Sequence, residues 1–374
     1  MRIFVLRSSS VESNPRIEKE IAVLLDAGHE VTVVGWDRDR AYEARKAKDL
    51  SINGRSVPRW LIGVSSSFGT GLRNMKPMLV FERRLFLFLR SRHNDFDCIH
   101  ACDFDTGYVA SRISAKYEKK LVYDIFDYFS DSRIMPKLLK AVISKMENSV
   151  VSRANATIIC TEQRRIQIAE AHPKRIVVIE NTPVARDFQS EKPAFDDKVH
   201  LSYTGTFSLD RYIEEILEAV RHYDDLWLDI AGFGRLEDLV VKASEECERI
   251  RYHGKVDHER ALRIEAGSDV IIALYDPKVP NNKLAAPNKF YEGLMLGVPL
   301  VTVRGTSVAD WVEELGTGRA VSSSFETSEF YDAVKTLTNN NRDNSITLRS
   351  KELYKGKYDW ANMAERLRNL YATL

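Results

Sequence analysis

The sequence contains no apolar stretch long enough to cross a lipid bilayer. A spanning helix needs roughly eighteen apolar residues without charge. The nearest approach, at 77–90, is interrupted by Glu82, Arg83 and Arg84. We therefore expect that no part of this chain traverses a membrane.

Cysteine is scarce, and its spacing excludes two common uses of the residue. The four cysteines are Cys98, Cys102, Cys160 and Cys247. They form neither a Cys-x-x-Cys pair nor the dense pattern of a disulfide framework. Because Met1 leads directly into the apolar run at 2–6, without the pattern of a signal peptide, we expect a reduced, cytoplasmic protein.

Neither sign of charge dominates the whole chain, since the formal net charge is +1. Residues 1–190 nevertheless carry 31 Lys and Arg against 23 Asp and Glu, which leaves 24 (55 − 31) against 31 (54 − 23) in the remainder. Most of the first excess lies between Arg55 and Arg92, where Glu82 is the single acidic residue. This distribution predicts an anionic partner for the first half of the chain.

At 374 residues the chain is too long for one ordinary core, so its length favours two domains. Apolar strand-like runs alternate with helical segments, a pattern typical of parallel sheets with helical crossovers. Strands are expected at 2–6, 30–36, 96–101, 120–126, 156–160, 175–181, 200–205, 226–232, 250–254, 269–275 and 299–303, and helices at 15–28, 106–119, 136–154, 212–223, 235–247, 259–267, 288–296 and 360–374.

The polar stretch at 183–198 lacks periodicity and suits a linker between the two series of elements. We therefore predict an α/β protein with two doubly wound, Rossmann-like domains at 1–185 and 197–356, followed by a helical tail at 357–374. Ligands in such sheets bind beyond the carboxyl ends of the strands, so the loops after strands are the candidates for function.

The stretch APNKFYEGLMLGVPLV at 286–301 places a cation at the start of a helix. Lys289 there opposes the helix dipole, which normally costs a few tenths to about one kcal/mol. A phosphate held by the N–H groups after Pro287 and Asn288 would explain this placement. Glu292 lies three residues on and could accept hydrogen bonds from a sugar hydroxyl. The alternative is that Lys289 and Glu292 form an ordinary i, i+3 ion pair.

Two further loops follow expected strands. In YTGTFSLDR, Gly205 lets the backbone approach a ligand and Arg211 could bind a phosphate, unless this is an ordinary turn with a solvated arginine. In AGFG, Gly232 and Gly234 form a lone G-x-G, which more often marks a tight strand-to-helix turn than a phosphate site.

The first half offers acidic residues in similar places. His100, Asp103 and Asp105 lie at and after one expected strand, and Asp124 and Asp127 at the end of another. They could supply a base, whereas His-x-x-Asp-x-Asp without a further histidine is a poor metal signature. Helix capping by the aspartates is an equally good interpretation.

Taken in order, several segments resemble the retaining glycosyltransferases of family 4, which have the GT-B fold of two Rossmann-like domains facing a central cleft. The resemblance spans nearly the whole chain. It rests on NPRIEKEIAVLLDAGHEVTVVGW, FDCIHACDFDTG, KLVYDIFD, VIENTP, YTGTFSLDR, AGFG, PNKFYEGLMLGVPLV and the closing YDWANMAERLRNLY.

The resemblance implies a nucleotide-diphospho-sugar donor, such as a UDP- or GDP-sugar, on the second domain and an acceptor on the first. Glu292 matches the second glutamate of the family's E-x7-E motif, which binds the ribose. Arg211 matches a diphosphate-binding lysine, and Gly205 the glycine before a diphosphate-binding arginine. Pro287, Asn288 and Lys289 match a common variant before that glutamate. The final helix of the family commonly crosses back to the first domain.

Three positions depart from the family pattern. Leu284 stands where the first glutamate of E-x7-E is expected, Thr206 replaces the diphosphate arginine, and Phe126 replaces a frequent histidine. The family mechanism needs no metal ion and no general base, because the leaving phosphate takes the proton of the acceptor on the same face. Arg211 and Lys289 would then stabilise the leaving group, with Asp103 or Asp127 assisting.

The basic segment at 73–92 mixes arginines with aromatic and aliphatic residues, as helices on anionic membrane surfaces do. A core helix with extended arginines is the alternative. We expect a hexosyltransferase acting on a glycan or lipid-phosphate-linked acceptor, peripheral to the inner membrane face and without a nucleic-acid partner. A sugar-nucleotide epimerase of the same fold, or a non-catalytic sugar-nucleotide-binding protein, is the alternative.

Overall fold

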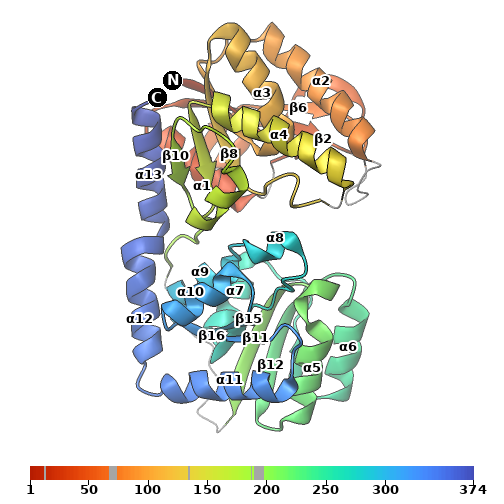
Figure 1. Ribbon diagram of the computed structural model, residues 1–374, viewed down its shortest axis with the longest axis vertical. Helices are drawn as coiled ribbons and strands as arrows, with labels where there is room; N and C mark the ends of the chain where they lie inside the picture. The colour runs from red at the N-terminus through yellow and green to blue at the C-terminus, as the bar shows by residue number, and fades with distance from the viewer. Residues whose placement is uncertain (12–13, 67–73, 134, 187, 189–197) are drawn as a thin grey trace. The chain divides into compact units, whose positions relative to one another are not determined.

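The computed structural model describes residues 1–11, 14–66, 74–133, 135–186, 188 and 198–374 (Figure 1). They divide into two compact units. Unit 1 comprises Met1–Glu180 with Met363–Leu374, and unit 2 comprises Asn181–Asn362. Residues 187 and 189–197 of the expected linker, and Arg73 of the basic segment, lie outside the described residues.

Unit 1 is built on an eight-stranded sheet in the order β10-β9-β8-β7-β1-β2-β6-β3. β3 pairs antiparallel with β6, and the other described pairs are parallel. The strands are β1 (Arg2–Leu6), β2 (Glu30–Asp37), β3 (Tyr42–Lys46), β6 (Arg59–Gly63), β7 (Cys98–Cys102), β8 (Lys120–Ile125), β9 (Ala156–Ile159) and β10 (Ile176–Val178), with β4 (Leu50–Ile52) and β5 (Arg55–Val57) as a separate hairpin.

The central strands of unit 1 are apolar because helices cover both faces of the sheet. Every residue of β7 is buried, as are four of the five residues of β1. The helices are α1 (Pro15–Asp26), α2 (Met75–Ser91), α3 (Asp103–Tyr117) and α4 (Lys137–Arg153), with the end of α13 (Trp360–Ala372). α1 begins as its sequence predicts, since the Asn14 side chain accepts from the backbone N–H of Ile17 and Pro15 is the first helical residue.

Unit 2 contains a six-stranded parallel sheet in the order β13-β12-β11-β14-β15-β16. Its strands are β11 (Val199–Thr206), β12 (Leu226–Phe233), β13 (Ile250–Tyr252), β14 (Val270–Ile272), β15 (Leu300–Val303) and β16 (Gly318–Val321). Its helices are α5 (Ile213–His222), α6 (Glu237–Glu246), α7 (His258–Ala266), α8 (Pro280–Lys283), α9 (Asn288–Leu296), α10 (Ser307–Glu314), α11 (Thr327–Asn340) and α12 (Ser345–Leu353).

The strand order reverses direction once in each sheet. In unit 2 the chain moves outward from β11 to β13 and then returns to β14 on the other side of β11. In unit 1 the corresponding point lies between β1 and β7. Helices before and after such a point lie on opposite faces, which leaves a crevice at the carboxyl ends of the two strands. The prediction of two doubly wound domains is confirmed.

The strands in 42–63 were not predicted from the sequence. β3 reads YEARK and is partly or fully exposed, so it lacks the apolar alternation that identifies a strand. It forms because β6 offers an open edge, and it shifts register between Tyr42 and Arg45.

Gly232 illustrates how closely β12 approaches β11 at the carboxyl edge of the unit 2 sheet. The two strands pair up to Gly205↔Gly232 and Thr206↔Phe233. A Cβ atom at Gly232 would lie 1.8 Å from the carbonyl oxygen of Gly205, and its φ is 153°. Any side chain there must push the end of β11 aside.

We expect Gly232→Ala to lower the unfolding midpoint of unit 2 by about 5 °C or more. This corresponds to roughly 2 kcal/mol in a unit of this size, a typical cost of overpacking. Gly356→Ala is the matched control, because nothing lies within 4 Å of an added Cβ there. Differential scanning calorimetry measures both, and equal midpoints for the two variants would contradict the close approach.

Candidate functional site

Arg211 lies at the carboxyl end of β11, at the reversal point of unit 2. A turn at Leu209–Arg211 follows β11 and carries its side chain. The guanidinium stacks on the Tyr275 ring, 4.1 Å from its centroid, and forms an ion pair with Asp210. Tyr275 follows β14, so the two strands flanking the reversal supply the two stacked side chains.

A chain of hydrogen bonds holds Asp210 beneath this arginine. Asn282 is 5% exposed and donates from Nδ2 to Asp210 Oδ2 at 3.0 Å and to the Asp276 carbonyl at 3.0 Å. The Ser208 hydroxyl donates to Asp210 Oδ1 at 2.6 Å. Sequence reasoning missed Tyr275 and Asn282, because neither belongs to a motif.

Lys289 forms a buried triad with two carboxylates. Its Nζ donates to Glu265 Oε1 from α7 and to Glu292 Oε2 at 2.7 Å, one turn along α9. Both glutamates are nearly inaccessible, at 0% and 2% exposure. Burial lowers the pKa of Lys289, but the two carboxylates outweigh this and raise it above its usual value.

This triad corrects the expectation of an uncompensated cation at the start of α9. The i, i+3 pair with Glu292 exists, but it is buried and shared with Glu265, which the sequence analysis did not identify. The signal was present in α7, where Glu265 lies on the same face as the buried Ala261 and Leu262. An acidic residue in an apolar stripe indicates a buried partner.

The remaining predicted residues of unit 2 surround the same edge. Gly205 and Thr206 end β11, and Pro287 precedes the first turn of α9 in an extended conformation. Asn288 Oδ1 accepts from Asn181 Nδ2 at 3.0 Å. Gly232 and Gly234 lie against the backbone of Gly205 and Phe207, so they allow close packing. Burial raises the pKa of Tyr275, and the charges of Arg211 and Lys289 both oppose this rise.

In unit 1, Asp103 follows β7 at the reversal point and holds the loop after β8. Its φ is 64°, a left-handed conformation that is strained for a residue with a side chain. Its carboxylate accepts from the backbone N–H groups of Phe126 at 3.0 Å and Asp127 at 3.3 Å, and lies 3.3 Å from Arg7. The structure therefore brings Asp103 together with the loop that contains Asp127.

Asp127 itself projects outward, with its side chain 53% exposed and paired with the buried Arg164 at 3.3 Å. Phe126, where the resemblance predicts a histidine, lies beneath two guanidinium groups, with Arg7 at 4.2 Å and Arg16 at 4.0 Å from its ring centroid. Asp105 is buried near the start of α3, where it accepts from the N–H of Thr106.

His100 and Asp124 lie deeper in unit 1, in a buried network with α1. Arg16 donates to Asp124 Oδ1 at 2.7 Å and to Glu20 Oε1 at 3.0 Å. The second oxygens of these carboxylates lie 3.5 and 3.6 Å from His100 Nε2. His100 Nδ1 is 2.7 Å from the Tyr371 hydroxyl of α13.

Ligand atoms of His100, Cys102 and Asp124 lie within 4.8 Å of one another, close enough for a metal ion. Arg16 already supplies a positive charge to both carboxylates of this network. The ion pair of Arg16 with Asp124 ties α1 to the sheet, and the contact between His100 and Tyr371 ties α13 to it.

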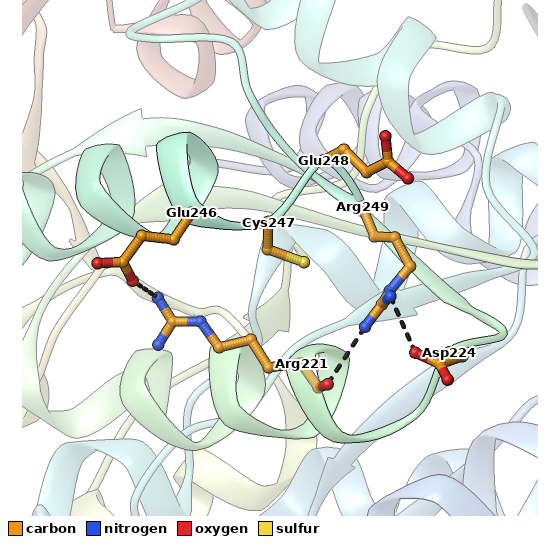
Figure 2. Close-up of a pocket in the computed structure, with 6 residues that line it drawn as sticks. All are labelled: Arg221, Asp224, Glu246, Cys247, Glu248 and Arg249. Atoms are coloured by element: carbon orange, nitrogen blue, oxygen red, sulfur yellow. Dashed lines mark hydrogen bonds and ion pairs between the residues drawn. The ribbon is translucent and has the colours of Figure 1, made fainter.

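A pocket of about 400 Å³ lies at the other edge of the unit 2 sheet, where β12 and β13 begin. Figure 2 shows its charged side chains pairing with one another: Arg221 with Glu246 at 2.8 Å and Arg249 with Asp224 at 3.0 Å. Cys247 and Glu248 complete its lining. Because ligands of doubly wound sheets bind at the carboxyl edge, this pocket is not part of the candidate site.

Comparison with known proteins gives a family match over part of the chain and a fold over all of it. Residues 20–182 match the family described as Glycosyltransferase Family 4. No curated protein shows significant similarity. A sucrose-phosphate synthase from Thermosynechococcus elongatus has a TM-score of 0.73 at 14% identity, over 100% of this chain and 98% of that one.

Two further solved structures are similar over 100% of both chains. HepE of Anabaena, in complex with UDP, has a TM-score of 0.70 at 12% identity. The lipopolysaccharide outer core galactosyltransferase WaaB, in its apo form, also has a TM-score of 0.70 at 12% identity. At these identities the likeness shows a shared GT-B fold.

The environment of Asp103 generates a pH-dependence prediction. Burial raises the pKa of Asp103 to about 7 against the opposing charge of Arg7, while Asp105 and Asp127 raise it further. Its stabilising contribution is therefore full below the usual pKa of 3.8 and is lost as the pH rises through about 7. Relative to wild type, Asp103→Asn should gain at least about 1 kcal/mol of unfolding free energy between pH 4 and pH 7.5.

Urea unfolding at several pH values measures this difference. Asp97→Asn is the control of opposite sign: hydrogen bonds from Arg2 lower the pKa of Asp97 to about 2. The stabilising contribution of Asp97 is lost only as the pH falls below about 4. The difference in unfolding free energy between Asp97→Asn and the wild type should therefore stay constant between pH 5 and 7.5. Parallel pH profiles for wild type and Asp103→Asn would show that Asp103 does not titrate in this range.

Proposed function

We propose that this chain is a glycosyltransferase of the family 4 type, and that it transfers a hexose from a nucleotide-diphospho-sugar to a hydroxyl of a glycan or lipid-linked acceptor, with retention of configuration. The observation that carries the proposal is the stacked pair of Arg211 and Tyr275, at the carboxyl ends of β11 and β14. It places a fixed guanidinium at the point where a doubly wound sheet binds nucleotides.

The chemistry of the step explains why a fixed guanidinium is useful there. Departure of the nucleoside diphosphate develops negative charge on the phosphate oxygens, and cations held in advance lower the cost of that charge. Arg211 supplies a planar fork of donors, and the backbone N–H groups at the start of α9 add a helix N-terminus. Gly205 and Thr206 leave the backbone at the end of β11 open to the diphosphate.

We assign binding of the ribose to Glu292 and binding of the acceptor to unit 1. The donor phosphate receives the proton of the acceptor hydroxyl. With retention by same-face attack, the leaving phosphate oxygen accepts the hydroxyl proton, so neither a metal ion nor a strong general base is needed. Asp103 and Asp127, at the carboxyl edge of the unit 1 sheet, would orient the acceptor. UDP is our first choice of nucleotide, because HepE, which has this fold, was solved with UDP.

Arg211→Ala should weaken binding of the matching nucleoside diphosphate by about 1.5 to 3 kcal/mol, or roughly ten- to a hundredfold, because it removes hydrogen bonds to a charged group. A thermal-shift screen of UDP, GDP and ADP selects the ligand. Isothermal titration calorimetry then measures the affinity, with Arg221→Ala as control, since Arg221 is also an ion-paired arginine but lies at the opposite edge. Equal affinities for the two variants would refute the assignment.

We further propose that α2 rests on an anionic membrane surface that presents a lipid-linked acceptor. None of the described helices has the length and apolar character needed to cross a bilayer. One face of α2 is core, with Phe81, Leu85, Phe88 and Leu89 buried. Its other face exposes Leu79 (58%) and Leu87 (49%) between cations.

The exposed arginines of α2 are suited to a membrane surface, whereas Arg84 is not. Lys76, Arg83 and Arg90 are exposed, while burial raises the pKa of Glu82 to about 8 and keeps it largely neutral at pH 7. Arg84, which the sequence analysis included in the basic surface, instead donates to the carbonyl oxygens of Tyr42 and Gly63 inside the unit.

The exposed face of α4 also combines apolar side chains with cations, as that of α2 does. Leu138 (86%) and Val142 (56%) project from it together with the exposed Lys137 and Lys145. α2 and α4 both pack against α3, on one face of the unit 1 sheet (Figure 1). Exposed apolar side chains among cations are suited to the headgroup region of an anionic bilayer.

The double variant Arg83→Glu/Arg90→Glu should bind vesicles containing 30 mol% phosphatidylserine at least about tenfold more weakly, at roughly 1 kcal/mol per basic residue near the surface. Arg221→Glu/Arg263→Glu, which reverses two exposed charges of unit 2, should sediment as wild type does. Loss of sedimentation in both variants, or in neither, would contradict a role for α2.

A further inference from the structure

We propose that Glu265 and Lys289 are positioning residues for Glu292: they hold its carboxylate in place to accept hydrogen bonds from the ribose hydroxyls, and Lys289 does not bind the diphosphate. The proposal rests on the proposed function, which places a nucleotide at this edge. It differs from the interpretation of Lys289 as a phosphate-binding cation, which follows from its position at the start of α9.

The geometry of the triad supports a holding role. Glu265 Oε1 accepts from both Lys289 Nζ and the Thr204 hydroxyl, so the lysine is anchored through Glu265 to β11. Lys289 Nζ then donates to Glu292 Oε2 at 2.7 Å. Three elements of unit 2, namely β11, α7 and α9, thereby fix the position of a single carboxylate oxygen.

The second oxygen of Glu292 has a different neighbour. Glu292 Oε1 lies 3.7 Å from Nδ1 of His258, whose side chain is 54% exposed. One oxygen therefore accepts from the lysine, while the other lies near the half-exposed His258. This is the arrangement required of a carboxylate that accepts from a ribose hydroxyl without changing its own position.

Charge balance argues against a phosphate contact by Lys289. Its side chain is 14% exposed, and its single positive charge already serves two buried carboxylates. Moving the ammonium toward a phosphate would leave Glu265 and Glu292 without their counter-charge, and an unpaired buried charge is strongly unfavourable. Arg211 and the backbone N–H groups at the start of α9 would then bind the diphosphate.

Glu265 also accounts for a departure from the family motif. Leu284 stands where the first glutamate of E-x7-E is expected, so α9 is not preceded by that carboxylate. Glu265 brings a second carboxylate to the same region from α7. Its Oε2 is buried and has no hydrogen-bond partner among the described residues, so Oε1 makes all of its hydrogen bonds.

The test compares a nucleoside diphosphate with its 2′,3′-dideoxy analogue. The diphosphate among UDP, GDP and ADP that stabilises the wild type is used, and affinities for both ligands are measured by calorimetry. We expect the wild type to prefer the natural ligand by at least about tenfold, because a carboxylate–hydroxyl hydrogen bond contributes about 1.5 to 3 kcal/mol. Glu292→Gln, Glu265→Gln and Lys289→Met should each reduce this preference toward one.

Arg211→Ala is the matched reference, because a phosphate-binding residue should weaken both ligands equally and leave the preference unchanged. If Lys289→Met behaves like Arg211→Ala, the lysine binds phosphate and the proposal is overturned. Unchanged affinities for both ligands in Glu265→Gln would also overturn it.

Glu265→Gln retains the Lys289–Glu292 ion pair, so it gives a decisive result even if Lys289→Met does not fold. Lys289→Arg keeps the positive charge that Lys289→Met removes. A preference for the natural ligand close to that of the wild type in Lys289→Arg would support positioning by the cation. Failure of the proposed function gives a different result: the wild type would then bind none of the three diphosphates, and both proposals would fall.

Discussion

Two buried carboxylates share one cation in each unit, and the need to keep these charges compensated determines how the helices dock on the sheets. In unit 1, Arg16 of α1 pairs with Glu20 and with Asp124 at the end of β8. In unit 2, Lys289 of α9 pairs with Glu292 and with Glu265 of α7. Because removing one partner would leave an unpaired charge in a nonpolar interior, each set specifies one relative placement of its elements.

The two sets lie in different parts of their units. The Arg16 set lies inside the core of unit 1, whereas the Lys289 set lies at the edge of the unit 2 sheet that is the candidate site. The Arg16 set includes His100 and reaches Tyr371, so it joins α1, the sheet and the end of the chain within unit 1. The Lys289 set lies at the carboxyl edge of its sheet, beside the stacked Arg211 and Tyr275. A buried ion-pair network at a ligand-binding edge can orient a side chain for a substrate, whereas one inside a core can only orient the fold.

A buried carboxylate also fixes a loop at the carboxyl edge of the unit 1 sheet. Asp103 adopts a left-handed conformation and directs its carboxylate at two backbone N–H groups of the loop after β8. The hydrogen bonds and Arg7 offset part of the cost of burying this carboxylate. These hydrogen bonds therefore hold the loop that contains Phe126 and Asp127 against the end of β7.

Sequence patterns predicted the elements whose local signals agree with their final environment. Asn14 and Pro15 begin α1, and the apolar runs at β1, β7 and β11 become central strands buried on both faces. Local patterns failed for β3, whose charged residues acquire a strand conformation only from the neighbouring β6. They also failed for Arg84, which resembles its exposed neighbour Arg83 in sequence but donates hydrogen bonds inside the unit.

The sequence by itself determined the fold class, the repeated strand–helix alternation and the residues at the ends of strands, because these depend on periodicity and on local turn chemistry. Only the tertiary structure decided which of those residues meet. Glu265 lies 24 positions before Lys289 in the chain, yet it compensates the charge of that lysine. Pairing of this kind depends on the docking of α7 and α9 beside β11, and residue spacing along the chain does not encode the distance between two docked helices.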